Sequence, residues 1–107
     1  MAEKLVVAYI TAKDRDEAWR IGRALVEKRL AACINVWDGM RSCYRWEGKI
    51  EEASEAVLLA KTTESNADAL VKVVKALHGY SVPCVVFLPV EGGNPEYLQW
   101  LRDAVSS

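Results

Sequence analysis

One histidine and three cysteines are the side chains of this 107-residue chain best suited to bind a metal ion or act as nucleophiles. His78 stands at the predicted end of a helix, Cys84 follows a proline, and Cys33 lies in a predicted strand. Thiolates are soft ligands that suit Cu(I), and imidazole suits copper as well, so His78, Cys84 and Cys33 are the candidate metal ligands. Two alternatives stay open: His78 as a capping or hydrogen-bonding residue, and Cys33 as a small core residue.

No catalytic constellation accompanies these residues. His78 and Cys84 could be drawn as a base and a nucleophile, but no supporting motif, glycine-rich phosphate loop or H-E-x-x-H sequence is present. The cysteines fit neither a zinc template nor a disulfide framework, which is typical of reduced thiols in a cytoplasmic protein. We therefore expect a cytoplasmic protein that is not an enzyme and has no organic cofactor.

The remaining residues with chemical potential are aromatic or charged. Tyr44, Trp46 and Trp37 could form a ligand platform, but packing between subunits is the simpler interpretation. Lys61 follows an apolar strand, where it could meet a partner's carboxylate or an anionic ligand. An acidic stretch is interpreted as a solvated face that blocks a sheet edge, with weak recruitment of cations as the alternative; it comprises Glu51, Glu52 and Glu55.

Composition predicts one ordinary globular domain over residues 1–107. Apolar residues make up 51% of the chain and charged residues 27%, with a formal net charge of −1. This balance gives no general attraction to nucleic acid or to a membrane surface. The sequence shows no signal peptide and no apolar run of membrane-spanning length.

A long β-hairpin positions the aromatic residues. Glu47-Gly48 is a turn candidate that would set Trp46 opposite Lys49 and Tyr44 opposite Glu51. Each arm then has about 15 residues and a length of about 50 Å. A domain of this size is only about 34 Å across, so the hairpin must bend or extend beyond its own domain by about 15 Å. A ribbon that reaches so far predicts self-association.

Periodicity supplies the other elements. We expect a first helix that begins with a capping box formed by Asp14 and Glu17, and a second that is capped by Ser65 or Asn66. Asp38-Gly39 predicts a bulge, and Gly79 suits the position after the second helix. The predicted strands span residues 5–10, 31–37 (resuming at 40), 53–62 and 84–90, and the helices span residues 15–29, about 66–78 and 95–105.

The order β-α-β-β-α-β-α predicts an α+β fold of the ferredoxin-like, split βαβ type. Four antiparallel strands would form the sheet, with residues 53–62 at its centre, and two helices would cover one face. The other face would expose apolar side chains. Three copies that pack their sheets together would cover it.

Five segments of the chain resemble the CutA divalent-cation-tolerance family. They span nearly the whole sequence in order: Arg29–Val36, Ser42–Ile50, Leu59–Thr63, Ala76–Pro83 and Asn94–Leu101. The resemblance implies a ferredoxin-like fold and an interlocked homotrimer, similar in shape to the PII signalling proteins. It also implies a cytosolic protein linked to tolerance of copper and other divalent cations.

Two positions depart from the family pattern. The family usually has proline where this chain has Gly79, and glutamate where it has Cys84. The second change replaces a hard oxygen ligand by a soft thiol. A family site for a hard divalent cation is therefore in doubt here.

Two hypotheses follow. The first is a homotrimeric metal-response protein that binds copper or another divalent cation in clefts between subunits. The second is a PII-like sensor or scaffold that binds a small anionic ligand or an unidentified protein partner. In both, we assign six residues to the inter-subunit cleft or trimer interface: Trp37, Tyr44, Arg45, Trp46, Lys61 and Tyr80.

Overall fold

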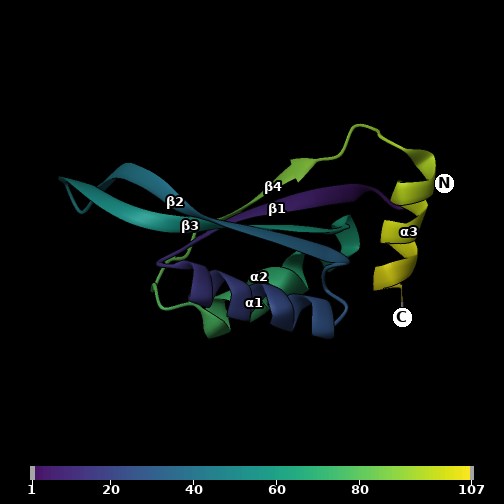
Figure 1. Ribbon diagram of the computed structural model, residues 1–107, viewed down its shortest axis with the longest axis horizontal. Helices are drawn as coiled ribbons and strands as arrows, with labels where there is room; N and C mark the ends of the chain where they lie inside the picture. Colours follow the sequence, from purple (N-terminus) through teal and green to yellow (C-terminus); the bar gives the residue numbers. More distant parts are fainter. Residues whose placement is uncertain (1, 107) are drawn as a thin grey trace.

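Two helices, α1 and α2, cover one face of a four-stranded antiparallel sheet in the computed structural model, which describes residues 2–106 (Figure 1). The strand order is β2-β3-β1-β4, so β3 is central as predicted. The ferredoxin-like α+β fold is confirmed. The elements are β1 (Leu5–Ala12), α1 (Arg15–Glu27), β2 (Cys33–Trp46), β3 (Lys49–Thr63), the 3₁₀ turn η1 (Glu64–Asn66), α2 (Ala67–Leu77), β4 (Val85–Pro89) and α3 (Pro95–Val105).

Side chains at the helix starts explain where the helices begin. Asp14 Oδ1 accepts a hydrogen bond from the Glu17 backbone N–H at 2.8 Å, which confirms the predicted cap of α1. Asn94 caps α3 in the same way. Asn66 occupies the cap position of α2, but its side chain makes no capping bond. Its amide instead donates to the hydroxyls of Thr62 and Thr63 at the end of β3.

Element boundaries differ from the prediction in a few places. The first helix ends at Glu27, not near residue 29, because Arg29 takes a positive φ of 58° that a right-handed helix excludes. The strand predicted over residues 53–62 begins at Lys49, since the hairpin pairing continues to the turn. The last strand is shorter than predicted, and Cys84 lies just before it.

The core lies between the sheet and the two helices. It contains fully buried residues of β1, α1, β3 and α2, among them Ile10, Ile21, Leu58, Leu70 and Val74, while the core-facing side chains of β2 and β4 are partly buried. Gly22 allows α1 to approach the sheet closely, because a Cβ at this position would lie 2.8 Å from Ile34 Cδ1. The helix layer and the sheet are therefore held at a fixed separation.

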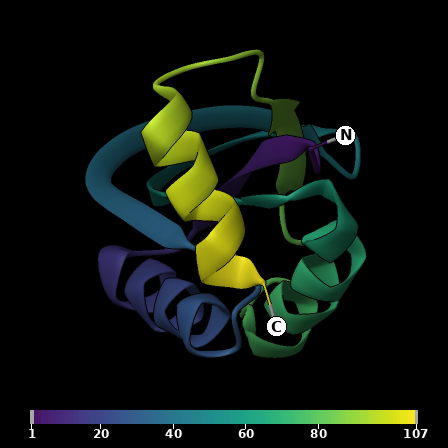
Figure 2. The same cartoon turned by 90° about the vertical axis from the view of Figure 1, so that its right-hand side faces the viewer.

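The hairpin of β2 and β3 both bends and extends. Glu47 and Gly48 have φ values of 50° and 79°, as a mirror-image two-residue turn requires, and Trp46 pairs with Lys49 as predicted. A bulge interrupts the pairing between Trp37 and Met40, also as predicted. The hairpin curves and projects beyond the helices (Figures 1 and 2), and the molecule measures 46 × 25 × 22 Å.

The sheet face away from α1 and α2 carries exposed apolar side chains. Trp37, Val86 and Leu88 are about half exposed, at 53%, 50% and 52%. Helix α3 packs across one end of the sheet (Figure 2), where it contacts β3. No helix among residues 2–106 is long and apolar enough to cross a membrane.

Candidate functional site

His78 lies at the junction of α2, β1 and the segment that follows α2. Its side chain is fully buried. Ring atom Nδ1 accepts a hydrogen bond from the Tyr80 backbone N–H at 3.0 Å, so the ring proton is on Nε2. Nε2 then donates to the Thr11 carbonyl oxygen, 2.7 Å away. Both ring nitrogens are thus engaged within the chain, as in the hydrogen-bonding alternative for this residue.

Glu17 places a second buried polar group beside the histidine. Its Oε1 lies 3.8 Å from His78 Nε2 and accepts from the Lys13 backbone N–H at 3.0 Å. Its Oε2 accepts from the Gly79 backbone N–H at 2.9 Å. The carboxylate therefore ties the start of α1 to the end of α2. A proline at position 79, which is usual in the resembling family, would have no N–H to donate.

Tyr80 extends this network to the sheet face away from α1 and α2, here called the open face. Its ring packs on the His78 ring with centroids 4.7 Å apart, and its hydroxyl donates to Glu55 Oε2 at 3.0 Å. Burial, followed by the hydrogen bond to Glu55, raises the pKa of the Tyr80 hydroxyl to about 12. The phenol therefore keeps its proton at neutral pH and acts only as a donor to the carboxylate.

Glu55 corrects one prediction. It was assigned to a solvated acidic stretch, but it is only 6% exposed. Glu55 pairs with Met40 across the hairpin, so its side chain lies on the same face as that of Met40. The other two members of the stretch, Glu51 and Glu52, are exposed as predicted.

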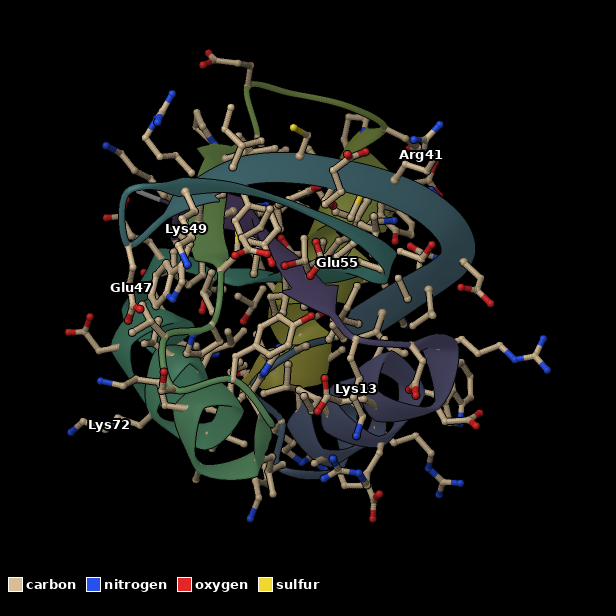
Figure 3. The ribbon with its side chains drawn as sticks, turned by 90° about the vertical axis from the view of Figure 1, so that its left-hand side faces the viewer. Lys13, Arg41, Glu47, Lys49, Glu55 and Lys72 are labelled. Carbon is tan, nitrogen blue, oxygen red and sulfur yellow. The ribbon has the colours of Figure 1, made fainter. Side chains whose placement is uncertain are left out.

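A groove of about 780 Å³ lies between the hairpin and the segment after α2. We call it the hairpin groove. Figure 3 shows Glu55 on the inner side of the curved hairpin. The side chains of Arg41 and Lys13 point away from Glu55 in the same view. The groove is lined by Tyr9 and Thr11 of β1, residues 40–44 and Trp46 of β2, Glu55 of β3, and residues 80–84.

The structure does not bring the three candidate metal ligands together within one chain. Cys84 is exposed and borders the hairpin groove, whereas His78 is buried behind Tyr80. Cys33 lies at the start of β2, where it pairs with Lys61 near the C-terminal end of β3. Within residues 2–106, no three His, Cys, Asp or Glu side chains are grouped so as to hold a metal ion. A metal site that uses these residues stays a prediction.

The six residues assigned to a cleft or interface do not all lie together in one chain. Three of them line the hairpin groove: Tyr44, Trp46 and Tyr80. Lys61 lies elsewhere, where its Nζ donates to the Tyr97 hydroxyl at 3.1 Å and sits 5.2 Å from the centre of that ring. Trp37 borders a smaller hollow beside α1, and Arg45 is exposed on the hairpin. Their role between subunits stays a prediction.

Three residues of the network were missed from the sequence. Glu17 was predicted to cap α1 only, and its bond to Gly79 joins residues 62 positions apart. Thr11 contributes a backbone oxygen, which no side-chain pattern reveals. The position of Glu55 could have been found, because the predicted turn fixes the hairpin register and places Glu55 on the same face as Val57.

Fold and site define the class of protein: a ferredoxin-like α+β domain whose protruding β2–β3 hairpin borders a groove with a buried carboxylate. The family model described as CutA1 divalent ion tolerance protein matches residues 6–104. The chain belongs to this family, as its sequence motifs indicated.

Relatives and solved structures agree with this assignment. The divalent-cation tolerance protein CutA of Thermus thermophilus is 50% identical over 91% of this chain and 94% of its own length. Human protein CutA is 47% identical over 94% of this chain, but the match covers only 56% of the human protein. The match to the chloroplastic rice protein CutA 1 also covers 56% of that protein. The chain thus spans about half the length of these plant and animal relatives.

The solved structure of the Thermus thermophilus protein superposes with a TM-score of 0.91 at 48% identity, covering 94% of this chain and 97% of that one. The rice CutA1 crystal structure gives a TM-score of 0.92 at 41% identity, with 95% and 94% covered.

Proposed function

We propose that the protein is a cytoplasmic homotrimer that binds copper or another divalent cation in clefts between subunits, as part of a metal response and without enzymatic activity. The observation that carries this proposal is the family match over residues 6–104. The exposed apolar face formed by Trp37, Val86 and Leu88 supports self-association, since a patch of this kind is usually covered by a partner.

Residues 2–106 of one chain do not group a complete donor set, so in this proposal a neighbouring subunit contributes ligands. Cys84 is the best-placed donor because its thiol is exposed at the hairpin groove and is soft enough for Cu(I). Glu55 could add an oxygen. His78 would first have to give up a hydrogen bond to Thr11 or Tyr80, which makes it a costly ligand.

Isothermal titration of the assembled protein with Cu(I) and Cu(II) tests the metal proposal. We expect Cys84→Ser to weaken Cu(I) binding by at least about tenfold, because a hydroxyl is a poor ligand for this ion. Cys43→Ser is the matched control, since Cys43 is also an exposed thiol at the groove but lies on the opposite strand face from Met40 and Tyr44. Unchanged binding in Cys84→Ser and in folded His78→Ala would remove both residues as ligands.

A second candidate function is a PII-like small-molecule sensor or interaction scaffold. The hairpin groove favours it, because its volume of about 780 Å³ and its aromatic lining are typical of small-molecule sites. A panel of metabolites should then raise the melting temperature of the protein. If copper raises it and no metabolite does, this candidate fails.

A further inference from the structure

The outer surface of α1 and α2, here called the helix surface, lies on the side of the sheet away from the open face (Figure 1). The two helices run side by side and contact each other (Figure 2). The predicted trimer would pack the open faces together and leave the helix surface in solvent. Neighbouring helices present ridges and grooves against which a third helix can pack. The helix surface is therefore accessible to a partner in the assembled protein.

The helix surface carries a local excess of positive charge. Residues 15–28 and 67–77 contain six basic and four acidic residues, a net charge of +2, although the whole chain has a formal net charge of −1. Two of the four acidic residues are already engaged within the chain. Glu17 is only 4% exposed, and Glu27 pairs with Arg23 at 3.6 Å. The charge that reaches solvent here is thus mainly positive.

Most basic side chains of the helix surface have no acidic partner. Among residues 2–106, four of them have no carboxylate oxygen within 4.0 Å of a side-chain nitrogen: Arg15, Lys28, Lys72 and Lys75. The side chain of Lys72 extends outward from α2 (Figure 3). Arg20 lies between the helices, where its Nη2 donates to the Leu77 carbonyl oxygen at 3.3 Å, so its charge also lacks a counter-ion.

Two apolar side chains lie among these charges. Trp19 is 54% exposed and Val26 is 39% exposed. A spacing of seven residues puts them on the same side of α1, with Arg23 one turn after Trp19. Aromatic residues and arginine are enriched at protein interfaces, and tryptophan and arginine contribute most to binding there. The helix surface thus combines an apolar anchor with cationic residues around it.

We propose that the helix surface docks an acidic amphipathic helix of another protein, with its carboxylates against the basic residues and its apolar side chains against Trp19 and Val26. This inference rests on the second candidate function, the interaction scaffold, and names its docking surface and the chemistry of its partner. Asp16 and Asp68 lie in the first turns of the two helices and disfavour a phosphate backbone or an anionic lipid surface, which present only negative charge. A protein helix can place a basic residue beside each aspartate.

The test uses the assembled protein and two designed peptides. One peptide is an amphipathic helix with leucine on one face and glutamate on the other, and its twin has lysine in place of every glutamate. We expect the acidic peptide to bind at least about tenfold more tightly than its twin in isothermal titration at low salt, and to bind more weakly as salt rises. Phosphatidylglycerol vesicles and duplex DNA are titrated in parallel.

The Lys72→Glu variant reverses one exposed charge of the helix surface. It should weaken binding of the acidic peptide by at least about threefold and strengthen binding of the lysine twin. Lys49→Glu is the matched control, since Lys49 is an exposed lysine at the turn of the hairpin, and it should leave both affinities unchanged (Figure 3). Trp19→Ala should weaken binding of the acidic peptide by at least about tenfold, because it removes the apolar anchor. Sedimentation of each variant checks that the assembly is unchanged.

Three results would overturn the inference: no binding of the acidic peptide, equal binding of the two peptides, or binding that Lys72→Glu and Trp19→Ala both leave intact. If vesicles or DNA bind and the acidic peptide does not, the surface belongs to lipid or nucleic acid. A melting shift with a metabolite but no binding of the acidic peptide would keep the sensor function and reject the docking surface.

Discussion

His78, a candidate metal ligand, has a structural role in this protein. Its ring accepts from the Tyr80 N–H and donates to the Thr11 carbonyl oxygen, so it joins β1 to the segment that follows α2. Glu17 closes the same junction from α1 through Gly79. These five residues form one hydrogen-bonded network, and its first effect is to hold Tyr80 in place over Glu55.

The His78→Phe variant tests this structural role. Phenylalanine has a similar shape but leaves the Thr11 carbonyl and the Tyr80 N–H unpaired, so we expect a loss of about 2–4 kcal/mol in the free energy of unfolding. Cys84→Ser, an exposed change, should stay within about 0.5 kcal/mol. Urea denaturation at a fixed protein concentration measures both. Equal stability of His78→Phe and the parent would refute the structural role.

The Tyr80 hydroxyl predicts a change of stability at high pH. Its pKa rises to about 12 in the folded protein, above the usual value near 10, because of burial and the Glu55 hydrogen bond. The folded state therefore holds this proton more tightly than the unfolded chain. The resulting stabilisation is complete below about pH 10 and disappears as the pH rises towards 12.

Ultraviolet titration of phenolate absorbance should find one of the four tyrosines ionising near pH 12, and Tyr80→Phe should remove that step. The free energy of unfolding of the parent should also fall more steeply than that of Tyr80→Phe over the same pH range. A late step that persists in Tyr80→Phe would contradict the assignment.

At the scale of elements, contact between α1 and the sheet depends on Gly22. A methyl group there would lie 2.8 Å from Ile34 Cδ1 and 2.9 Å from Leu58 Cδ1. Leu58 is fully buried and cannot move aside freely. The glycine therefore serves packing between layers and not local flexibility.

Gly22→Ala should destabilise the protein although alanine is the better helix former. Helix propensity would gain about 1 kcal/mol, while overpacking costs about 1–3 kcal/mol, so a net loss of up to about 2 kcal/mol is expected. Gly92→Ala is the control, since its added Cβ would meet nothing within 4 Å. Thermal denaturation of both variants decides the point; a gain in stability for Gly22→Ala would show that the layers can separate.

Local patterns predicted the elements well because their determinants are close in sequence. Glu47-Gly48 fixed the turn, and with it the pairing of Trp46 with Lys49. The network around His78 could not be predicted in the same way. Glu17 and Gly79 meet only because α1 and the end of α2 pack side by side, and nothing near either residue indicates the other.

The molecule as a whole has one covered sheet face and one open face. The open face places Trp37, Val86 and Leu88 in contact with solvent, and the hairpin extends beyond the helices that cover the other side. Both features imply that a single chain leaves apolar surface area exposed to solvent. The predicted trimer would bury it.

Equilibrium sedimentation tests that assembly. The intact protein should sediment as a trimer, and Leu88→Asp should shift it towards monomer by placing a charge on the open face. Trp19→Asp is the control, because Trp19 is 54% exposed but belongs to α1 on the opposite side of the sheet. A monomeric parent would contradict the prediction, as would equal effects of the two variants.

The bulge in β2 is a place where the hairpin arm can lose a residue and still keep the later side chains on their present face of the sheet. Asp38 and Gly39 together stand opposite Ala56, between the pairs Trp37–Val57 and Met40–Glu55. Deletion of Gly39 would leave both pairs intact and every later side chain on its present face, so only the curvature of the arm would change. A one-residue deletion elsewhere in the arm would turn the tip residues over. Insertions and deletions among relatives should therefore gather at this position, where they adjust the width of the groove and preserve its lining.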